Sequence, residues 1–213
     1  MRTIETTVYR YDELPTDEAK EKAREWFSRH VFEDSCDWEC VYEDAATVAD
    51  ILGVDLRQRR VNLMGGGHRY EPSIYFSGFW SQGDGACFEG TYRYAKGAAK
   101  KIREYAPRDA ELHRIADALQ AVQRRHFYRL VASTVHRGHY SHSGCMNVSV
   151  EDSEDRYRDI GDAEDDVTQL MRDFADWIYS QLEREYEYLT SDEAVEEALR
   201  ANEYEFDEDG NLL

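Results

Sequence analysis

Residues 74–94 read IYFSGFWSQGDGACFEGTYRY, where four glycines and seven aromatic residues surround a central Gly-Asp-Gly. Large apolar side chains recur along 74–80 and 86–94, as expected for two strands whose successive side chains point to opposite faces. The Asp-Gly connection suits a turn that needs positive φ, and Gly78 and Gly90 indicate a bulge or a close backbone approach. Because the segment lacks the spacing and the lysine of a phosphate-binding loop, we expect an antiparallel hairpin.

The remainder of the chain predicts an α+β fold. Apolar residues at helical spacing predict helices at 14–32, 37–53, 94–106, 109–127 and 162–188, and a short helix that starts at 191. Apolar residues that alternate with polar ones predict strands at 3–11, 54–64, 128–137 and 145–152. Thr16 is placed to cap the first helix and Gly53 to end the second. Residues 65–73 are expected to form a turn or loop, and 204–213 a turn or short strand. We expect a mainly antiparallel sheet of about five to six strands with packed helices and a long acidic C-terminal helix.

The 213 residues contain no linker rich in proline, glycine or serine, so we expect a single domain over 1–213 with an acidic helical part at about 160–202. Four scattered cysteines, Cys36, Cys40, Cys87 and Cys145, form no C-x-x-C pair, which fits a reducing cytoplasm. No window approaches the roughly 18 apolar residues of a membrane span. We therefore expect a soluble cytoplasmic protein with no membrane partner.

The charge of −19 is concentrated in the last third of the chain, where 151–213 contains 23 acidic residues and 5 arginines. The apolar residues there keep a helical period, so the acids belong to an ordered helix. This face is either only a solvated surface or a binding surface for a basic protein, and phosphate repulsion disfavours nucleic acid. The residues expected to form it are Asp162, Asp165, Asp166, Asp173 and Asp176.

Residues 96–129, by contrast, contain nine basic and four acidic side chains. The cations that stand out are Lys100, Lys101, Arg103, Arg124 and Arg125. They would either contact an anion or pair with the acidic third inside the fold, and pairing needs fewer assumptions.

Histidines recur at a spacing of three in HRGHYSHSGC, residues 136–145. The candidate ligands are His136, His139, His142 and Cys145, whose imidazole and thiolate groups zinc prefers. This spacing in a loop is not an established metal motif, unlike H-E-x-x-H on a helix. We therefore expect no cofactor, with a zinc-dependent hydrolase that also uses Asp84 or Glu89 as the alternative. No G-x-S-x-G motif indicates a serine nucleophile.

The aromatic hairpin offers a second alternative, a pocket for a small ligand. Its candidate residues are Trp80, Asp84, Phe88, Glu89 and Tyr92. Aromatic side chains supply much of the apolar burial in a fold, so these rings are equally typical of a core.

Four motifs, IYFSGFWSQGDGACFEGTYRY, AVQRRHFYRL, HRGHYSHSGC and LTSDEAVEEALRANEYEFDEDG, together resemble those of uncharacterised proteins encoded by bacteriophages and prophages. The resemblance covers the chain from about Thr3 onward, and some of those relatives carry an automatic antitoxin label. It implies a phage setting in the cytoplasm of a bacterial host and supplies no catalytic residues.

We therefore expect a non-enzymatic phage accessory protein that binds and inhibits a host defence-related protein, in an anti-CRISPR-like manner, with its acidic face against a basic surface. The alternatives are a metal-dependent hydrolase or small-ligand-binding protein that uses the two hairpins, and an antitoxin-like protein that neutralises a toxin.

Overall fold

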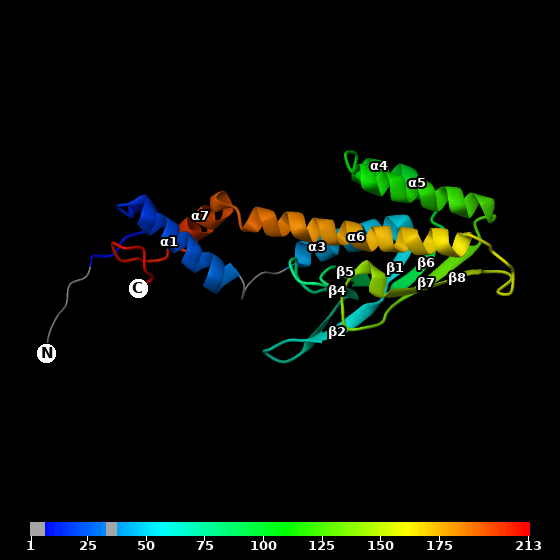
Figure 1. Cartoon of the computed structure of the whole chain (residues 1–213), viewed down its shortest axis with the longest axis horizontal. Coiled ribbons are helices and arrows are strands. Elements are labelled where there is room, and N and C mark those ends of the chain that lie inside the picture. The colour runs from blue at the N-terminus through cyan, green and yellow to red at the C-terminus, as the bar shows by residue number, and fades with distance from the viewer. Residues whose placement is uncertain (1–6, 33–37) are drawn as a thin grey trace. The chain divides into compact units, whose positions relative to one another are not determined.

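The computed structural model describes residues 7–32 and 38–213, and it combines helices with antiparallel sheets, which confirms the α+β class (Figure 1). The chain divides into two compact units: unit 1 contains 1–38 and 183–213, and unit 2 contains 39–182. Each is described by itself, and the expected single domain stays a prediction. Cys36 lies outside the described residues.

The main sheet of unit 2 has four antiparallel strands. In spatial order these are β1 (Val54–Leu56), β6 (Gly90–Arg93), β7 (Leu130–His136) and β8 (Met146–Asp152). Two smaller sheets pair β2 (Gln58–Asn62) with β3 (His68–Pro72), and β4 (Ile74–Phe76) with β5 (Ala86–Phe88). The strands expected in one sheet are thus distributed over three.

Four helices accompany this sheet: α3 (Glu39–Leu52), α4 (Ala98–Tyr105), α5 (Ala110–Arg125) and α6 (Ala163–Leu189). Asp109 caps α5, because its carboxylate accepts a hydrogen bond of 2.9 Å from the backbone N–H of Leu112. Gly53 ends α3 with φ of +90°, and a Cβ there would lie 2.2 Å from the carbonyl oxygen of Arg93. The expected helix boundaries are therefore close to the observed ones.

The helices cover one face of the main sheet (Figure 1). One row of residues paired across the four strands, Val54, Tyr92, Ala132 and Val150, is buried. The neighbouring row, Asp55, Thr91, Ser133 and Ser149, points to the opposite face and is exposed. This alternation is typical of an antiparallel sheet with one face packed and one face in water.

Gln123 joins α5 to the sheet. Its side chain is fully buried, donates to the carbonyl oxygen of Leu130 at 2.7 Å and accepts from the N–H of Leu130 at 3.2 Å. The same amide lies 3.3 Å from the hydroxyl of Tyr92. A buried side chain thus satisfies both backbone groups of the first residue of β7.

Unit 1 is built from η1 (Tyr11–Glu13), α1 (Asp17–Phe27), η2 (Ser28–Phe32), α7 (Asp192–Ala201) and the segment after α7. Its core contains Tyr11, Leu14, Ala19, Ala23, Phe27, Val195, Leu199 and Phe206. Thr16 caps α1 as expected, by accepting from the N–H of Ala19 at 3.1 Å. Glu196 of α7 accepts hydrogen bonds of 2.8 Å from both Arg24 and Tyr11, so the helices are joined by polar as well as apolar contacts.

Three expected elements differ from the structure. Residues 3–6 of the first expected strand lie outside the described residues; beyond them Tyr9 pairs only with Phe206, and a 3₁₀ helix follows. Residues 68–72 form a strand and not a loop, because they pair with β2. The expected strand 74–80 ends at Phe76, since Gly78 adopts φ of +98° and turns the chain.

We expect Gln123→Leu to lower the free energy of unfolding by about 3 kcal/mol, because it leaves the buried N–H and C=O of Leu130 without partners. Gln120→Leu, on an exposed position one turn earlier, should change it by less than about 0.5 kcal/mol. Urea denaturation followed by circular dichroism measures both. Equal stability of the two variants would contradict the role given to Gln123.

In unit 1 we expect Gly210→Ala to cost more than about 1 kcal/mol, because φ is +79° and a Cβ would lie 2.1 Å from the carbonyl oxygen of Ala19. Gly65→Ala, where no atom lies within 4 Å of the added carbon, is the matched control. Hydrogen exchange of the α1 and α7 amides should accelerate in the first variant only.

Candidate functional site

The five acidic residues expected to form a binding face fall into two groups on and beside α6. Asp166 pairs with Arg125 at 2.6 Å, and Asp173 pairs with Arg114 of α5. Asp162, Asp165 and Asp176 are exposed. The expected pairing of the basic segment with the acidic third is therefore confirmed for Arg125.

The other cations of 96–129 are arranged differently. Arg103 pairs with Asp117 at 3.1 Å, and Lys100 lies 3.6 Å from Glu104, so both use acids of their own segment. Lys101 and Arg124 are exposed. These cations do not form one anion site.

A groove of about 640 Å³ runs between α5 and α6. Its floor is apolar and contains Ala118, Ala121, Val122 and Leu170. Six charged residues also line it: Arg114, Arg125, Arg172, Asp165, Asp166 and Asp173. The structure thus brings three of the five expected acids together along one concave surface.

The internal ion pairs decide which charges a molecule in the groove would meet. The guanidinium of Arg114 lies between Glu111 and Asp173, and hydrogen bonds to both raise its pKa. The Nε atom of Arg172 is buried and has no hydrogen-bond partner among residues 7–32 and 38–213. Arg114 and Arg125 are therefore already neutralised. Among the described residues, Arg172 and Asp165 are the charges of the lining that have no ion-pair partner.

Apart from the paired Asp166 and Asp173, the first half of α6 and the residue before it contain four carboxylates: Asp162, Glu164, Asp165 and Asp176. All four side chains are exposed, and none forms an ion pair with a residue that the structure describes. Unit 1 has the larger excess of acids over bases, with 22 acidic and 8 basic residues, whereas unit 2 has 23 and 18. Of these four carboxylates Asp165 lines the groove, whereas Asp162, Glu164 and Asp176 lie outside its lining.

The residues of the expected aromatic pocket are divided between surface and core. Trp80 is exposed, whereas Phe88 and Tyr92 are buried. Burial raises the pKa of the Tyr92 hydroxyl to about 12. Asp84 accepts a hydrogen bond of 2.6 Å from the N–H of Ser81 and so stabilises its own loop.

Glu89 is brought next to the histidine loop. One of its carboxylate oxygens accepts from the backbone N–H of His136 at 3.2 Å, and the other lies 3.2 Å from Arg57. The side chain is only 13% exposed. Glu89 thus connects β7 to the segment between β1 and β2, which is a structural use of the carboxylate.

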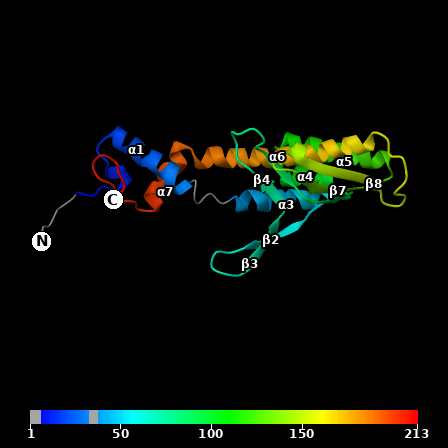
Figure 2. The same cartoon turned by 60° about the horizontal axis from the view of Figure 1, so that its bottom comes forward.

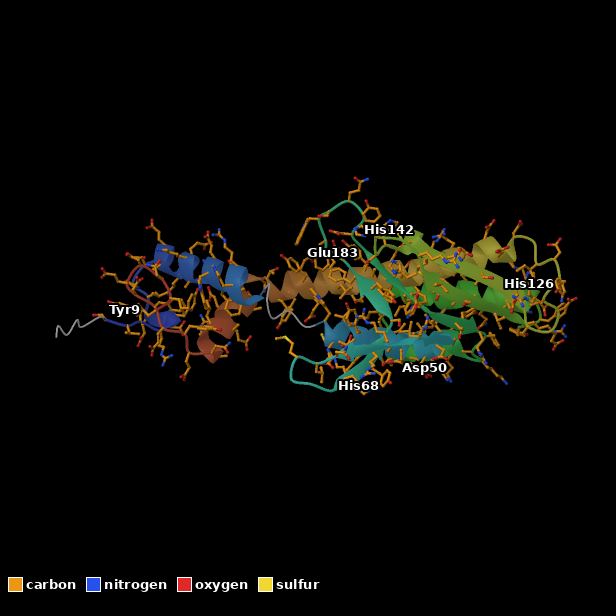
Figure 3. The ribbon with its side chains drawn as sticks, turned by 90° about the horizontal axis from the view of Figure 1, so that it is seen from below. Tyr9, Asp50, His68, His126, His142 and Glu183 are labelled. Carbon is orange, nitrogen blue, oxygen red and sulfur yellow. The ribbon has the colours of Figure 1, made fainter. Side chains whose placement is uncertain are left out.

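Residues 77–85 pack against the histidine loop, in which Figure 3 labels His142. A Cβ at Gly83 would lie 2.2 Å from the ring of Tyr140, and one at Gly85 would lie 2.7 Å from the Cβ of His142. Both glycines have positive φ. Their role is close loop packing, as expected for backbone glycines and not for a ligand loop.

The four candidate zinc ligands do not converge. Nε2 of His136 lies 2.9 Å from the carbonyl oxygen of Tyr140, and the ring of His139 packs against that of Tyr140. Nε2 of His142 lies 3.5 Å from Sγ of Cys145. Within 7–32 and 38–213, no three His, Cys, Asp or Glu side chains are placed to hold a metal ion. The zinc alternative stays a prediction without geometric support.

The cysteines show no activated thiol in the core. Cys87 is fully buried, and burial raises its pKa to about 12, so the thiol stays protonated at neutral pH. Cys40 is exposed on α3. Reactivity of a cysteine requires thiolate character, which the surroundings of Cys87 oppose.

Sequence reasoning missed the contribution of α5 to the groove. Arg114 and Asp173 are 59 residues apart, and Arg125 and Asp166 are 41 apart. The local Glu111–Arg114 spacing predicts a pair within one helix, and no local pattern predicts the second partner on α6. Only the packing of the two helices reveals it.

The model of one protein family, described as Domain of unknown function (DUF8835), matches residues 38–192. No curated protein and no solved structure matches the chain. Among the helices that the structure describes, none combines the length and apolar composition needed to cross a membrane.

We expect Asp173→Ala to lower the free energy of unfolding by about 1–2 kcal/mol, because its carboxylate is 15% exposed and also accepts from Gln169 at 2.7 Å. Asp166→Ala should cost less than about 1 kcal/mol, since that pair is exposed to water. Thermal unfolding measured at low and high salt gives both values. A larger loss for Asp166→Ala would contradict the ranking.

Proposed function

The chain belongs to the DUF8835 family, a domain of unknown function, and we propose a function for it from the geometry of its groove. In this proposal it is a non-enzymatic binding protein that holds a basic segment of a partner protein along the α5/α6 groove. The observation that carries the proposal is the groove itself, whose lining combines apolar residues with Asp165, an exposed carboxylate without an ion-pair partner in the described chain.

The size of the groove suits a peptide segment. Its volume of about 640 Å³ lies within the range of about 300–1,000 Å³ typical of ligand sites. An amphipathic segment can place apolar side chains on Ala121 and Leu170 of the floor. Its other face would then lie beside α6, as in other complexes in which a helix occupies an apolar groove.

The charge of the rim selects the partner. Carboxylates at Asp162, Glu164, Asp165 and Asp176 attract lysine or arginine and repel phosphate groups. Complementary charges of this kind raise the association rate and discriminate between partners more than they raise affinity. A basic protein surface is therefore the proposed partner, in preference to nucleic acid.

The resemblance to phage-encoded proteins supports a host protein as that partner. A basic segment held in the groove is no longer available to a host defence protein that would otherwise use it for nucleic acid. Inhibition by occupation of that surface is the mode of action we propose. It requires no catalytic residue in this chain.

The test uses a groove variant, Asp162→Asn, Glu164→Gln, Asp165→Asn and Asp176→Asn, which leaves Asp166 and Asp173 in their ion pairs. The control variant, Glu193→Gln, Glu197→Gln, Glu208→Gln and Asp209→Asn, removes the same charge from exposed positions of unit 1. A partner captured from bacterial lysate by the native chain is identified by mass spectrometry, and its Kd is measured by calorimetry.

We expect the groove variant to bind that partner at least about tenfold more weakly, equivalent to about 1.4 kcal/mol, and the control to bind within about twofold of the native chain. High salt should reduce the difference, because it screens the exposed carboxylates. Native affinity in the groove variant would refute the proposed function.

A further inference from the structure

The strands β2 and β3 form an arm, defined as residues 57–72, that extends beyond the rest of unit 2 (Figures 1 and 2). The two strands form a separate two-stranded sheet. Every residue from 62 to 70 is exposed. The arm therefore presents its tip to solvent or to another molecule.

The two faces of the arm differ. On one face, Glu71 pairs with both Arg59 and Arg69, and the guanidinium of Arg59 lies over the ring of Tyr75 at 5.5 Å. The contact with Tyr75 and an ion pair of 3.6 Å between Arg69 and Glu39 of α3 hold that face against the rest of unit 2. The opposite face is the one available for binding.

On the opposite face Arg60 is paired in register with Tyr70. Arg60 is exposed and forms no ion pair with a residue that the structure describes. Tyr70 is 65% exposed and packs edge-on against His68, which Figure 3 labels. At the tip Met64 is completely exposed.

This composition indicates a protein contact. Single exposed apolar residues are ordinary, but here methionine, tyrosine and arginine gather on one projecting hairpin, and these types are enriched at interfaces. Nucleic acid is a weaker match, because the outward face offers one unpaired arginine, whereas phosphate binding uses several cations. The arm thus combines a cation with apolar side chains, which is the chemistry that the α5/α6 groove accepts.

We propose that the tip of the arm docks in the α5/α6 groove of a second copy of this chain, with Arg60 against the exposed carboxylates of α6 and Met64 on the apolar floor. The inference rests on the proposed function, because it gives the same groove a competing occupant. Charge complementarity carries the choice: Arg60 of the arm has no ion-pair partner among the described residues, and the unpaired Asp165 lines the groove, with three more unpaired carboxylates on or directly before α6. Self-association and partner binding are then mutually exclusive.

The arrangement of the two surfaces dictates the form of the assembly. Within unit 2 the arm and helix α5 lie on opposite sides of the main sheet (Figure 1). A contact between two different surfaces is heterologous, and it adds further copies unless the rotation closes a ring. The contact is small, so we expect weak association, with Kd on the order of 10–100 µM.

Analytical ultracentrifugation of the full chain tests this proposal over about 5–300 µM, a range set by that weak contact. The average mass should rise with concentration and fall at high salt, because the contact includes exposed charges. An arm variant, Arg60→Glu with Met64→Ser, should remain monomeric. Its control is Arg108→Glu, the same charge change at an exposed position outside the arm, which should associate as the native chain does.

Mixing provides the sharper measurement. The groove variant has an intact arm, and the arm variant has an intact groove, so each alone should be monomeric. Together they offer one intact arm and one intact groove, and the mixture should stop at a pair of chains. A monomeric native chain at every concentration, or native association in the arm variant, would overturn the proposal.

The same variants separate this inference from the proposed function. The arm variant should bind the captured partner at nanomolar protein concentration with at least native affinity. If the groove variant keeps the partner but loses self-association, the proposed function fails and the arm contact stands. If it loses the partner while the native chain stays monomeric, the arm contact fails alone.

Discussion

The side-chain amide of Gln123 holds the end of helix α5 against the first residue of β7, and both layers of unit 2 depend on this junction. Between α5 and β7 the backbone reverses direction through Phe127 and Tyr128, which both adopt positive φ. This conformation costs about 1–3 kcal/mol for each residue that is not glycine. The N–H of Tyr128 donates to the carbonyl oxygen of Gln123 at 2.7 Å, and the amide of Gln123 fixes Leu130. One buried residue therefore stabilises a strained reversal and positions an inner strand of the main sheet.

The groove follows from the same arrangement. Gln123 anchors α5 near its C-terminal end, and Asp109 caps its first turn. These two contacts fix the position of α5 beside α6. Asp109 also accepts a hydrogen bond of 2.8 Å from the indole N–H of Trp177 on α6, which joins the two helices near one end. Ion pairs at Asp166 and Asp173 join them farther along. The hollow between these contacts is thus held open by rigid elements, a useful property in a binding surface.

Local patterns were enough to predict most elements of this fold, because caps such as Thr16 and stop residues such as Gly53 act within a few residues. The strand β3 was missed because its stability comes from pairing with β2 and not from its own composition. For the groove, helical periodicity placed the acids on α6 correctly. Which of them remain unpaired could not be predicted, since Arg114 reaches Asp173 only through the packing of helices distant in sequence. The residues of the expected aromatic pocket are separated for a similar reason. The strand expected to contain Trp80 ends at Phe76, so the Trp80 ring is exposed to solvent, whereas Phe88 is buried in the core.

The core of unit 1 combines residues of η1 and α1 with residues of α7 and of the segment after α7. Ala19 and Tyr11 share that core with Leu199 and Phe206, and Tyr9 exchanges two backbone hydrogen bonds of 2.9 Å with Phe206. During translation the early residues leave the ribosome well before their partners exist, whereas all strands of the main sheet lie between 54 and 152. Unit 2 can therefore complete its sheet while α1 still lacks the residues that bury its apolar face. A nascent chain would expose that face until residues 195–206 have been synthesised, which makes α1 the natural point of contact for chaperones.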